Sequence, residues 1–536
     1  MFIAPAPLPD DPAILQRLLL EAMAEIERPR LRIAGLERAR FGRRSEQLGD
    51  AALQEESEEL EQSLAEQSAK LEAVASALKT PGETQVPETA PQPKRNRGAL
   101  PSHLPRIEVI VDIEDKTCPC CGGDLHVIGE DRAEMLDYIP ARFQVRVIRR
   151  PRYGCRDCEE AVVQAPAPER PIDGGMATEA LLAHVLVNKY SDHLPLYRQS
   201  QIFAREGVTL ERADRLSLHR SASRPDRSTL SNWVGRACWW LAPLHGLMLS
   251  TVLSSPRVFA DDTTLPVLDP GKGRTKTGRL WCYAVDNRPW RGPGHPAAAY
   301  VYSENRKAEH PAVHLKGFRG LLQTDGYTGF IRLATPDDAI KLAFCWAHAR
   351  RKFHDIHAAT KSPHAEEALL RIAALYAIEI DINGQAAEER LRVRQQSSRP
   401  LVDAMHAWMT EQLERISGRS ALAQAIRYAL NHWEGLILFL DDGRFELDTN
   451  TVERAMRPVA LGRKNALFAG SDAGARHWAI IATLIQTAKL NDVDPLAWLT
   501  DVLERIVSGR TKQHQLETLL PWNRKAEREA ANAGTG

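Results

Sequence analysis

The segment "RVFADDTTLPVL" (residues 257–268) opens a part of the chain in which short apolar runs replace the helical pattern before it. Three further runs follow: "GRLWCYAVDN" (278–287), "AAAYVYSEN" (297–305) and "GLLQTDGYTGF" (320–330). They are rich in β-branched or aromatic residues and are bounded by Gly, Pro and Asn. These features predict four strands, of which the first three are consecutive and antiparallel.

Helical patterns alternate with the later strands. The segment "KAEHPAVHLKGF" (307–318) precedes the fourth strand, and "AHARRKFHDI" (347–356) follows a fifth, "IKLAFCW" (340–346). Three strands followed by alternating helices and strands is the opening order of an RNase H-like sheet. We therefore expect a mixed α/β chain of several domains, with an RNase H-like core at 250–480 and a helical insertion at about 356–445.

Acidic residues lie where such a core would need them. Asp261 and Asp262 are at the end of the first strand, Asp325 is at the end of the fourth, and Glu453 lies on a helix opened by "DTNTVERA" (448–455). Because adjacent strand residues point to opposite sides, spacing alone does not choose between the two neighbouring aspartates. Three carboxylates from distant segments suffice to hold Mg²⁺ or Mn²⁺, which accept hard oxygen ligands.

Each acid also has a structural explanation. Asp325 precedes Gly326, and Asp-Gly pairs are common in turns. Glu453 can be a first-turn charge that interacts favourably with the helix dipole, with Asp448 or Thr449 as the helix cap. Three acids on three elements, in the order that this fold requires, favour a metal site over three unrelated structural roles.

The N-terminal region, residues 1–80, has a helical composition. Six of eight successive a/d heptad positions are Leu or Val, and Ser57 and Gln67 are the exceptions. The apolar positions are Leu53, Leu60, Leu64, Leu71, Val74 and Leu78. This seam predicts a coiled coil that brings copies of the chain together, with a single helix packed on its own domain as the alternative. A Pro-rich linker at 81–105 and a zinc-binding region at 106–165 follow.

Two cysteine pairs lie in the zinc-binding region. Cys118 and Cys121 are separated by 33 residues from Cys155 and Cys158. Each CxxC pair can supply two thiolates to one tetrahedral Zn²⁺ ion, and the β-like sequence between the pairs is typical of a zinc ribbon. Cys120 could replace a neighbour as ligand. The remaining cysteines are isolated and are expected to be buried core residues: Cys238, Cys282 and Cys345.

Residues 170–248 contain two helical blocks with the outline of a helix-turn-helix DNA-binding region. The first helix ends at Gly207 and the second opens near Asp226. The segment 211–225 between them is longer than the usual turn and poor in apolar residues, so we expect an extruded loop there. A helical tail is expected at 481–536.

Composition limits the possible functions. The chain has 70 basic and 70 acidic residues, so any affinity for nucleic acid must come from local clusters of charge. No apolar run of about 18 residues and no secretory signal is visible, which predicts no membrane span and a cytoplasmic location. Eight cysteines in 536 residues, four of them paired at metal-binding spacing, favour metal ligands over disulfides.

Several blocks of the sequence resemble the transposases of the insertion sequence 66 family. The resemblance also includes the two CxxC pairs and covers nearly the whole chain. The blocks are "FGRRSEQL" (41–48), "ADDTTLPVL" (260–268), "KTGRLWCYAVD" (276–286), "LQTDGYTGF" (322–330), "CWAHARRKF" (345–353), "NTVERAMRPVALGRKNALFAGS" (450–471) and "IQTAKLNDVDPLAWLTDVLERI" (485–506).

This resemblance implies a DDE-type recombinase that cuts and joins DNA with a divalent metal. By motif match the catalytic acids are Asp261, Asp325 and Glu453, whereas Asp262 is at an acidic but non-catalytic position. The implied partners are the terminal inverted repeats of the element, target DNA, further copies of the chain on DNA, and small accessory proteins of the same element.

Basic residues beside these acids are predicted to contact DNA phosphates, with an ordinary solvated helix face as the alternative for those after the fifth strand. The predicted contacts are Arg350, Arg351, Lys352, Arg457, Arg463 and Lys464. Trp346 could stack on an unpaired base, although burial in the core is favoured.

Two other functions fit the same sequence. A regulator or inactive transposase would bind element ends without cutting, and the departures at Pro29 and at 211–225 favour it. A structure-specific nuclease would use the same acids without strand transfer.

Overall fold

The computed structural model describes residues 143–154, 162–164, 166–173, 175–208, 227–269, 271–334 and 340–533. By its contacts the chain divides into two units, residues 80–151 and the remainder, and all elements below belong to the remainder. Outside the described residues lie the predicted coiled coil, the predicted linker, the four cysteines predicted to bind zinc, and the 211–225 segment. Within the described part, no helix combines the length and the apolar character needed to cross a membrane.

A five-stranded mixed sheet is central to the fold, with strand order β5-β4-β3-β6-β7. Its strands are β3 (Arg257–Asp269), β4 (Arg274–Val285), β5 (Ala297–Ser303), β6 (Gly320–Thr324) and β7 (Ile340–Phe344). The pairs β3–β4 and β4–β5 are antiparallel, whereas β6 runs parallel to both β3 and β7. The prediction of five strands, with the first three antiparallel, is confirmed.

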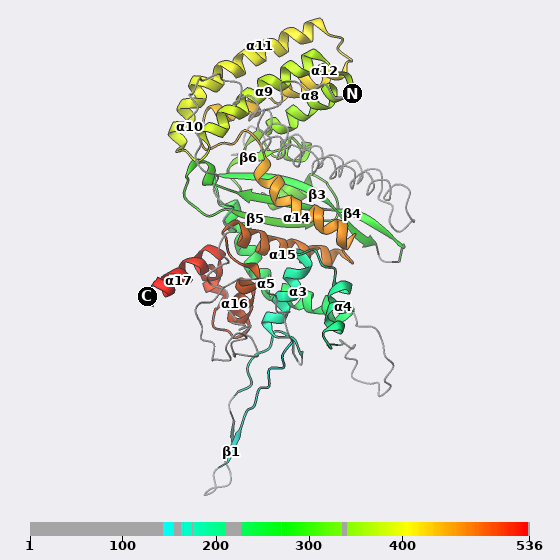
Figure 1. Ribbon diagram of the computed structural model, residues 1–536, viewed down its shortest axis with the longest axis vertical. Coiled ribbons are helices and arrows are strands. Elements are labelled where there is room, and N and C mark those ends of the chain that lie inside the picture. Colours follow the sequence, from blue (N-terminus) through cyan, green and yellow to red (C-terminus); the bar gives the residue numbers. More distant parts are fainter. Residues whose placement is uncertain are drawn as a thin grey trace, which may run out of the picture. The chain divides into compact units, whose positions relative to one another are not determined.

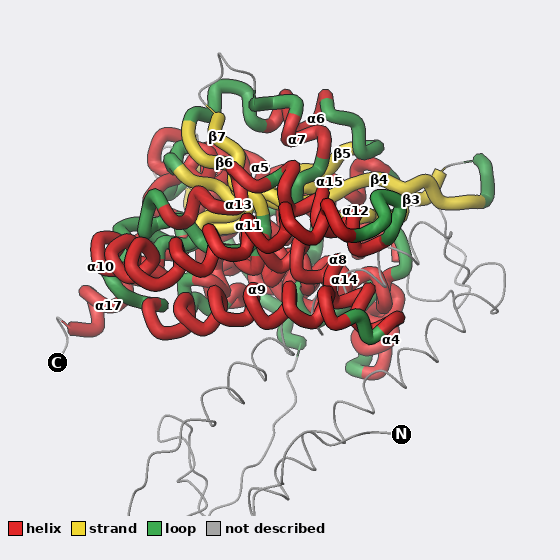
Figure 2. Tube along the Cα trace, turned by 90° about the horizontal axis from the view of Figure 1, so that it is seen from above, coloured by secondary structure: helices red, strands yellow, loops and turns green. Residues whose placement is uncertain are grey.

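The β3–β4 hairpin extends past its neighbours. β6 pairs with β3 only as far as Phe259, and β5 pairs with β4 only from Arg279. The outer part of the hairpin therefore projects from the sheet, as Figure 2 shows. Backbone hydrogen bonds from Leu268 to the Ala469 carbonyl (2.8 Å) and from Ala469 to the Pro266 carbonyl (2.9 Å) hold it against the chain that follows α14 (Asn450–Ala466).

Helices pack against both sides of the sheet (Figure 1). One core contains Trp281, Tyr283 and Leu322 of the strands, together with Val252 from the end of α5 and Phe330 of α7. The helices on that side are α5 (Arg227–Leu253), α6 (Glu309–His314) and α7 (Thr328–Ile331). Helix α14 lies against β3 and β4, and α15 (Asp472–Leu490) lies against β5. The strand positions that carry the candidate acids are thereby enclosed by helices.

Helix α15 covers the exposed edge of β5. An uncovered edge strand offers unpaired N–H and C=O groups that promote aggregation. The Thr487 hydroxyl accepts from the Ala298 amide (3.2 Å) and donates to its carbonyl (3.1 Å), while the Thr483 hydroxyl accepts from the Tyr300 amide (2.8 Å). Two threonines one helical turn apart therefore replace a neighbouring strand.

A group of helices follows β7, as the pattern at 356–445 predicted. They are α8 (Trp346–Thr360), α9 (Pro363–Ile382), α10 (Ala387–Val393), α11 (Arg399–Arg415), α12 (Ala421–Asn431) and α13 (Trp433–Ile437). Their shared core includes Trp346 and Phe353 of α8, Ile372 of α9, and Met405 of α11. Because α8 starts directly after β7 and also packs in this core, it joins the helical group to the sheet.

Buried ion pairs hold this helical group together. The Arg394 guanidinium is fully buried, binds both carboxylate oxygens of Glu379 (2.7 and 2.6 Å), and donates to the Phe439 carbonyl (3.0 Å). Arg390 binds Glu379 (3.2 Å) and Glu446 (2.9 Å). Since a buried charge that loses its partner is strongly destabilising, these contacts specify one packing of the helices.

The remaining elements are short strands and further helices. They are β1 (Arg152–Gly154), β2 (Val162–Gln164), α3 (Glu179–Tyr190), α4 (Leu196–Arg205), α16 (Pro495–Val507), α17 (Pro521–Ala533), η1 (Arg288–Trp290), η2 (Arg394–Ser398), η3 (Leu438–Leu440) and η4 (Gln513–Leu519). Helix α3 packs against α16, α15 and α5. Arg198 of α4 donates to Asn465 of α14 (3.5 Å), which places α4 beside the end of α14.

Replacing the edge-capping threonine tests how much this cover contributes. Thr487→Val keeps the side-chain shape but leaves the Ala298 N–H and C=O groups buried without a partner, so we expect a loss of about 1–3 kcal/mol of stability. Thermal unfolding followed by circular dichroism measures it. Thr410 is at an exposed position of α11, so Thr410→Val removes only a hydrogen bond to the His406 carbonyl and serves as the control. Equal melting temperatures for the two variants would contradict the role of Thr487.

Candidate active site

Asp261 and Asp262 are adjacent in β3 and have different surroundings. The Asp262 side chain is only 1% exposed, with Arg279 Nη1 3.1 Å from its Oδ2 and Arg306 Nη2 3.0 Å from its Oδ1. Two guanidinium groups thus neutralise this carboxylate. Asp261 accepts a hydrogen bond from the Asp262 amide (2.7 Å) and lies opposite Cys282 in the hairpin register. The structure therefore distinguishes two aspartates that spacing alone could not.

Asp325 follows β6 at the start of a tight turn. Its Oδ1 accepts from the Tyr327 amide (2.9 Å), and Gly326 adopts a φ of 91° that favours glycine. Its Oδ2 lies 3.9 Å from Arg306 Nη2, and its backbone carbonyl accepts from the Tyr428 hydroxyl (3.1 Å). Asp325 is therefore a turn residue, as Asp-Gly pairs often are. This structural role is compatible with its predicted role as a metal ligand.

Glu453 lies in the first turn of α14. Its Oε1 accepts from the Thr449 hydroxyl (2.8 Å) and lies 3.8 Å from His348 Nδ1. Thr449 is the N-cap residue, but its side chain orients Glu453 instead of capping the helix amides. Asp448 accepts from the Asn450 amide (3.0 Å), and burial raises the pKa of Asp448 to about 7.

The chain before α14 is held against the ends of the two parallel strands. Gln323 of β6 donates to the carbonyls of Glu446 (2.7 Å) and Asp448 (3.2 Å). The Trp346 amide, at the end of β7, donates to the Leu447 carbonyl (3.1 Å). These contacts bring Glu453 close to Asp261 and Asp325, although the whole helical group separates Glu453 from both aspartates in the sequence.

The charges of the other two acids act on Asp261. Burial raises the pKa of Asp261 well above its ordinary value, and the negative charges of Asp325, Asp262 and Glu453 raise it further, whereas His348 lowers it. Carboxylates that repel one another in a buried place are stabilised by a cation. The oxygen-rich donor set of Asp261, Asp325 and Glu453 fits a hard divalent ion such as Mg²⁺ or Mn²⁺.

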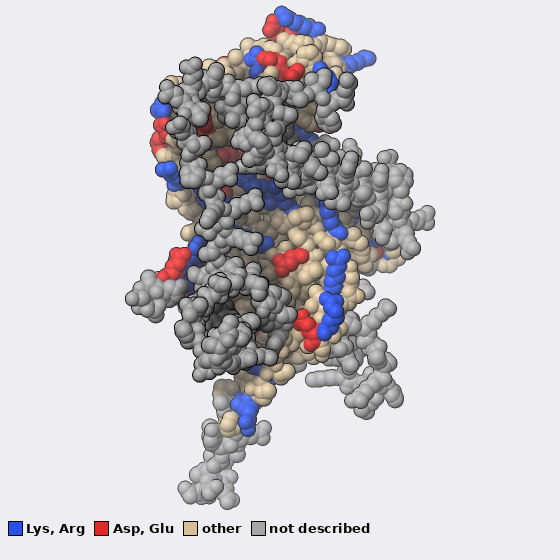
Figure 3. Space-filling view, viewed as in Figure 1, with Lys and Arg blue, Asp and Glu red and all other residues tan. Residues whose placement is uncertain are grey.

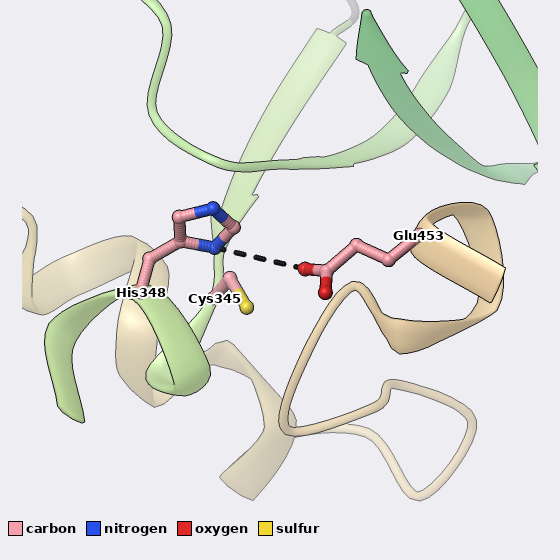
Figure 4. Close-up of side chains that lie close together, drawn as sticks. All are labelled: Cys345, His348 and Glu453. Atoms are coloured by element: carbon pink, nitrogen blue, oxygen red, sulfur yellow. Dashed lines mark ion pairs between the residues drawn. The ribbon is translucent and has the colours of Figure 1, made fainter. Parts of the chain in front are cut away.

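A thiol and an imidazole lie beside Glu453 (Figure 4). Ligand atoms of Cys345, His348 and Glu453 all lie within 4.8 Å of one another. Cys345 is the N-cap residue of α8, and His348 is in the first turn of that helix. The thiol sulfur accepts from the Thr449 amide (3.3 Å), so the starts of α8 and α14 are joined here.

Some predicted DNA contacts lie at the surface. Lys352 is exposed on α8, with its ammonium 4.3 Å from the centre of the Tyr428 ring. Arg457 and Lys464 are exposed on α14. Figure 3 shows Lys and Arg side chains gathered in a row in the region of α4 and α15 on the face drawn. Lys352, Arg457 and Lys464 are accessible to a phosphate backbone.

One predicted DNA contact, Arg350, needs correction, whereas Arg351 and Arg463 make contacts within the chain and stay predictions. Arg350 is only 2% exposed, because its position on α8 faces the core, so it does not present its charge at the surface. Arg463 donates to the carbonyl and hydroxyl of Thr264 and thereby ties α14 to β3. The Arg351 side chain is 14% exposed and lies 4.0 Å from Asp355. Trp346 is fully buried and donates to the Leu436 carbonyl (2.8 Å), which excludes base stacking by this residue in this structure.

The residues that surround Asp262 carry no distinctive sequence pattern. Arg279 resembles an ordinary strand charge, and Arg306 resembles an ordinary loop charge, so no local signal identified them. The expected burial of the isolated cysteines is confirmed for Cys238, Cys282 and Cys345. The predicted zinc ligands lie outside the described residues: Cys118, Cys121, Cys155 and Cys158.

Comparison with known proteins agrees with the sequence resemblance. Residues 174–477 match the family described as "Transposase IS66 family", and residues 115–159 match the "zinc-finger binding domain of transposase IS66". Residues 483–522 match the "IS66 C-terminal element", and residues 30–109 match "Transposase C of IS166 homeodomain". The zinc-finger match supports Zn²⁺ as a metal of this chain, and the set of domains supports DNA as its partner.

Similar proteins occur in Sinorhizobium fredii, where they are named only as uncharacterized. Protein y4jD is 51% identical over 81% of this chain and 83% of its own length. Protein y4qI is 41% identical over 92% of this chain and 88% of its own length. Four ordered family matches span the chain from residue 30 to residue 522. The chain belongs to the IS66 transposase family.

Proposed function

We propose that this chain is a DDE-type transposase that binds the ends of its element and catalyses metal-dependent cleavage and strand transfer of DNA. One observation carries the proposal: Asp261, Asp325 and Glu453 come from three separate elements, and the charges of Asp325 and Glu453 help to raise the pKa of Asp261. Asp262, the neighbouring acid, is instead neutralised by Arg279 and Arg306. An acidic cluster of this kind is suited to binding a cation.

The strand arrangement supports an RNase H-like core. Three antiparallel strands are followed by two strands parallel to the first, in the order β5-β4-β3-β6-β7. The acids lie on the central strand, after the adjacent parallel strand, and on a helix that starts beside both. The helical group between β7 and α14 is then the insertion that precedes the catalytic glutamate.

Divalent metal, when bound, would activate the attacking oxygen and stabilise the charge that develops on the scissile phosphate. The residues of this chain orient the three ligands. The Asp262 amide holds Asp261, the Tyr327 amide holds Asp325, and the Thr449 hydroxyl holds Glu453. Ligands fixed in this way lose little conformational freedom when the ion binds. Lys352, Arg457 and Lys464 are the exposed bases proposed to contact the DNA backbone.

Zinc and self-association belong to the N-terminal part of the proposal. Cys118, Cys121, Cys155 and Cys158 are proposed to hold one Zn²⁺ ion per chain, and the seam within 1–80 is proposed to pair chains on DNA. Cutting two element ends in concert requires two active sites, which paired chains would supply. Small accessory proteins of the element remain proposed partners.

Substituting Glu453 separates cutting from binding. Glu453→Gln keeps the size and removes the charge, so cleavage of end-sequence DNA in Mg²⁺ should fall at least about a hundredfold, which corresponds to several kcal/mol of lost stabilisation. End binding in a gel-shift assay should survive. Glu434→Gln, an exposed acid on α13, is the control. Wild-type cleavage by Glu453→Gln at saturating Mg²⁺ would overturn the catalytic role.

The same assay tests the alternatives. Wild-type protein that shifts end DNA without cutting it would indicate a regulator or an inactive transposase. Nicking without joining to target DNA would indicate a nuclease. Cleavage followed by strand transfer supports the transposase.

The raised pKa of Asp261 predicts how stability depends on pH without added Mg²⁺. A carboxyl group whose folded pKa is raised favours the folded state at low pH, and this contribution is lost as pH rises from about 4 through the folded pKa. Asp261→Asn should therefore melt above wild type at pH 8 and approach it near pH 4, by about 2–4 °C per kcal/mol of relieved repulsion. Added Mg²⁺ should stabilise only wild type.

The control for this experiment has the opposite sign. Hydrogen bonds from Tyr302 and Lys276 lower the pKa of Asp472, so its contribution to stability is present at neutral pH and lost in acid. Asp472→Asn should therefore melt below wild type at pH 8. If Asp261→Asn also melted below wild type at that pH, the idea that the acids repel one another would fail.

The cysteine pairs give a prediction about metal content. Cys155→Ser removes one thiolate from the proposed ribbon site, so elemental analysis of the purified chain should show loss of one zinc per chain. DNA binding should weaken with it, because the ion would position the arginine-bearing strands between the pairs. Full zinc content together with full DNA binding would refute the ligand assignment.

A further inference from the structure

Glu453 has metal-binding neighbours that strand cleavage as proposed above does not use. The Cys345 sulfur, a ring nitrogen of His348 and a carboxylate oxygen of Glu453 lie within 4.8 Å of one another, and Figure 4 shows the three side chains converging from two helices. The His348 Nδ1 to Glu453 Oε1 distance is 3.8 Å. Asp261 and Asp325 contribute no ligand atom to this group.

These donors differ in chemical character from the three acids. A thiolate and an imidazole are soft or intermediate ligands that select Zn²⁺, whereas Mg²⁺ prefers oxygen. In a tetrahedral zinc site with bonds of about 2.0–2.3 Å, the ligand atoms are about 3.3–3.8 Å apart. Since the ligand atoms now lie within 4.8 Å of one another, each pair would have to approach by at most about 1.5 Å.

The backbone around this group holds its ligands in place. Cys345 lies between β7 and α8, where the Thr449 amide donates to its sulfur (3.3 Å). An amide directed at a sulfur is a typical outer contact of a metal-bound thiolate. His348 and Glu453 lie in first helical turns, and both side chains are partly exposed, at 20% and 16%. The Cys345 thiol itself is buried, so an ion would have to enter past the His348 and Glu453 side chains.

We propose that Cys345, His348 and Glu453 form a zinc-binding site that competes with the catalytic cation for Glu453, so that Zn²⁺ inhibits strand cleavage. Binding forms bonds from zinc to sulfur, nitrogen and oxygen, the thiol proton is released to solvent, and water completes the tetrahedron. Glu453 cannot serve both ions in one geometry. The zinc site does not depend on the proposed function, whereas the inhibition of cleavage rests on it.

Cobalt titration of the full-length protein tests the site itself. Co²⁺ bound to thiolate absorbs in the near ultraviolet, and a ribbon already loaded with Zn²⁺ retains it because Zn²⁺ binds such sites more tightly than Co²⁺. Wild type should develop this band with one equivalent of Co²⁺, and Cys345→Ser should lose it. Cys238→Ser, which removes another buried thiol, should keep it.

A second variant guards against misfolding of the first. His348→Gln leaves the thiol in place and should weaken Co²⁺ binding at least about tenfold, in line with loss of one ligand contact. Melting temperatures identify any variant that does not fold. Absence of the band in wild type, or a band of equal size in folded Cys345→Ser, would overturn the site.

Cleavage in Mg²⁺ with added Zn²⁺ tests the competition. The apparent Kd for Zn²⁺ is measured first in the same Mg²⁺ buffer. At a Zn²⁺ concentration ten times that Kd, the rate of wild-type cleavage should fall about tenfold, as expected for occupancy of a single competing site. The ratio of rates with and without Zn²⁺ should stay near one for Cys345→Ser. Cobalt binding without any effect of Zn²⁺ on wild-type cleavage would refute the competition. A wild type that never cleaves would instead count against the proposed function, and the cobalt result would still decide the site.

Discussion

Glu453 reaches the acidic cluster because the chain crosses the ends of β6 and β7 as it returns from the helical group. The fully buried amide of Gln323 donates to two carbonyls of the returning segment, Glu446 and Asp448. Trp346 donates to Leu447 from the end of the neighbouring strand. A buried amide that lost these partners would be costly, so the crossing point is well defined. Helix α14 starts directly after it, and its first turn then lies beside Asp325 and Asp261.

Ion pairs fix the helical group on the far side of the same crossing. Glu446 binds Arg390 (2.9 Å), and Arg257 of β3 lies 3.9 Å from the same carboxylate. Burial lowers the pKa of Arg257 to about 10, which still leaves it charged at neutral pH. The central strand, the returning segment and the helical insertion therefore share one buried network. Such networks favour a single arrangement, because any alternative leaves a buried charge unpaired.

The distribution of charge around the acids follows from the geometry of β3. Alternation along a strand sends Asp261 and Asp262 to opposite sides, so one backbone presents one acid to Arg279 and Arg306 and the other to the acidic cluster. The neutralised aspartate adds rigidity through its amide, which donates to Asp261. The gathering of Asp261, Asp325 and Glu453 is what makes this place suitable for a cation and connects the fold to the proposed chemistry.

Local sequence patterns determined the strands of this protein and its family. Strand-like runs predicted the five strands, period-two alternation separated the faces of Asp261 and Asp262, and ordered motifs identified the family. Tertiary structure alone decided which charged side chains can bind a cation or DNA and which are held by other residues of the chain. Arg306 meets Asp262 across 44 residues, the Thr449 amide meets Cys345 across 104, and Arg463 meets Thr264 across 199. Periodicity reports which face of its own element a side chain occupies, but the partner on that face comes from a distant segment. For that reason the burial of Arg350, the anchoring of Arg463 and the convergence of Cys345, His348 and Glu453 could not be read from the sequence.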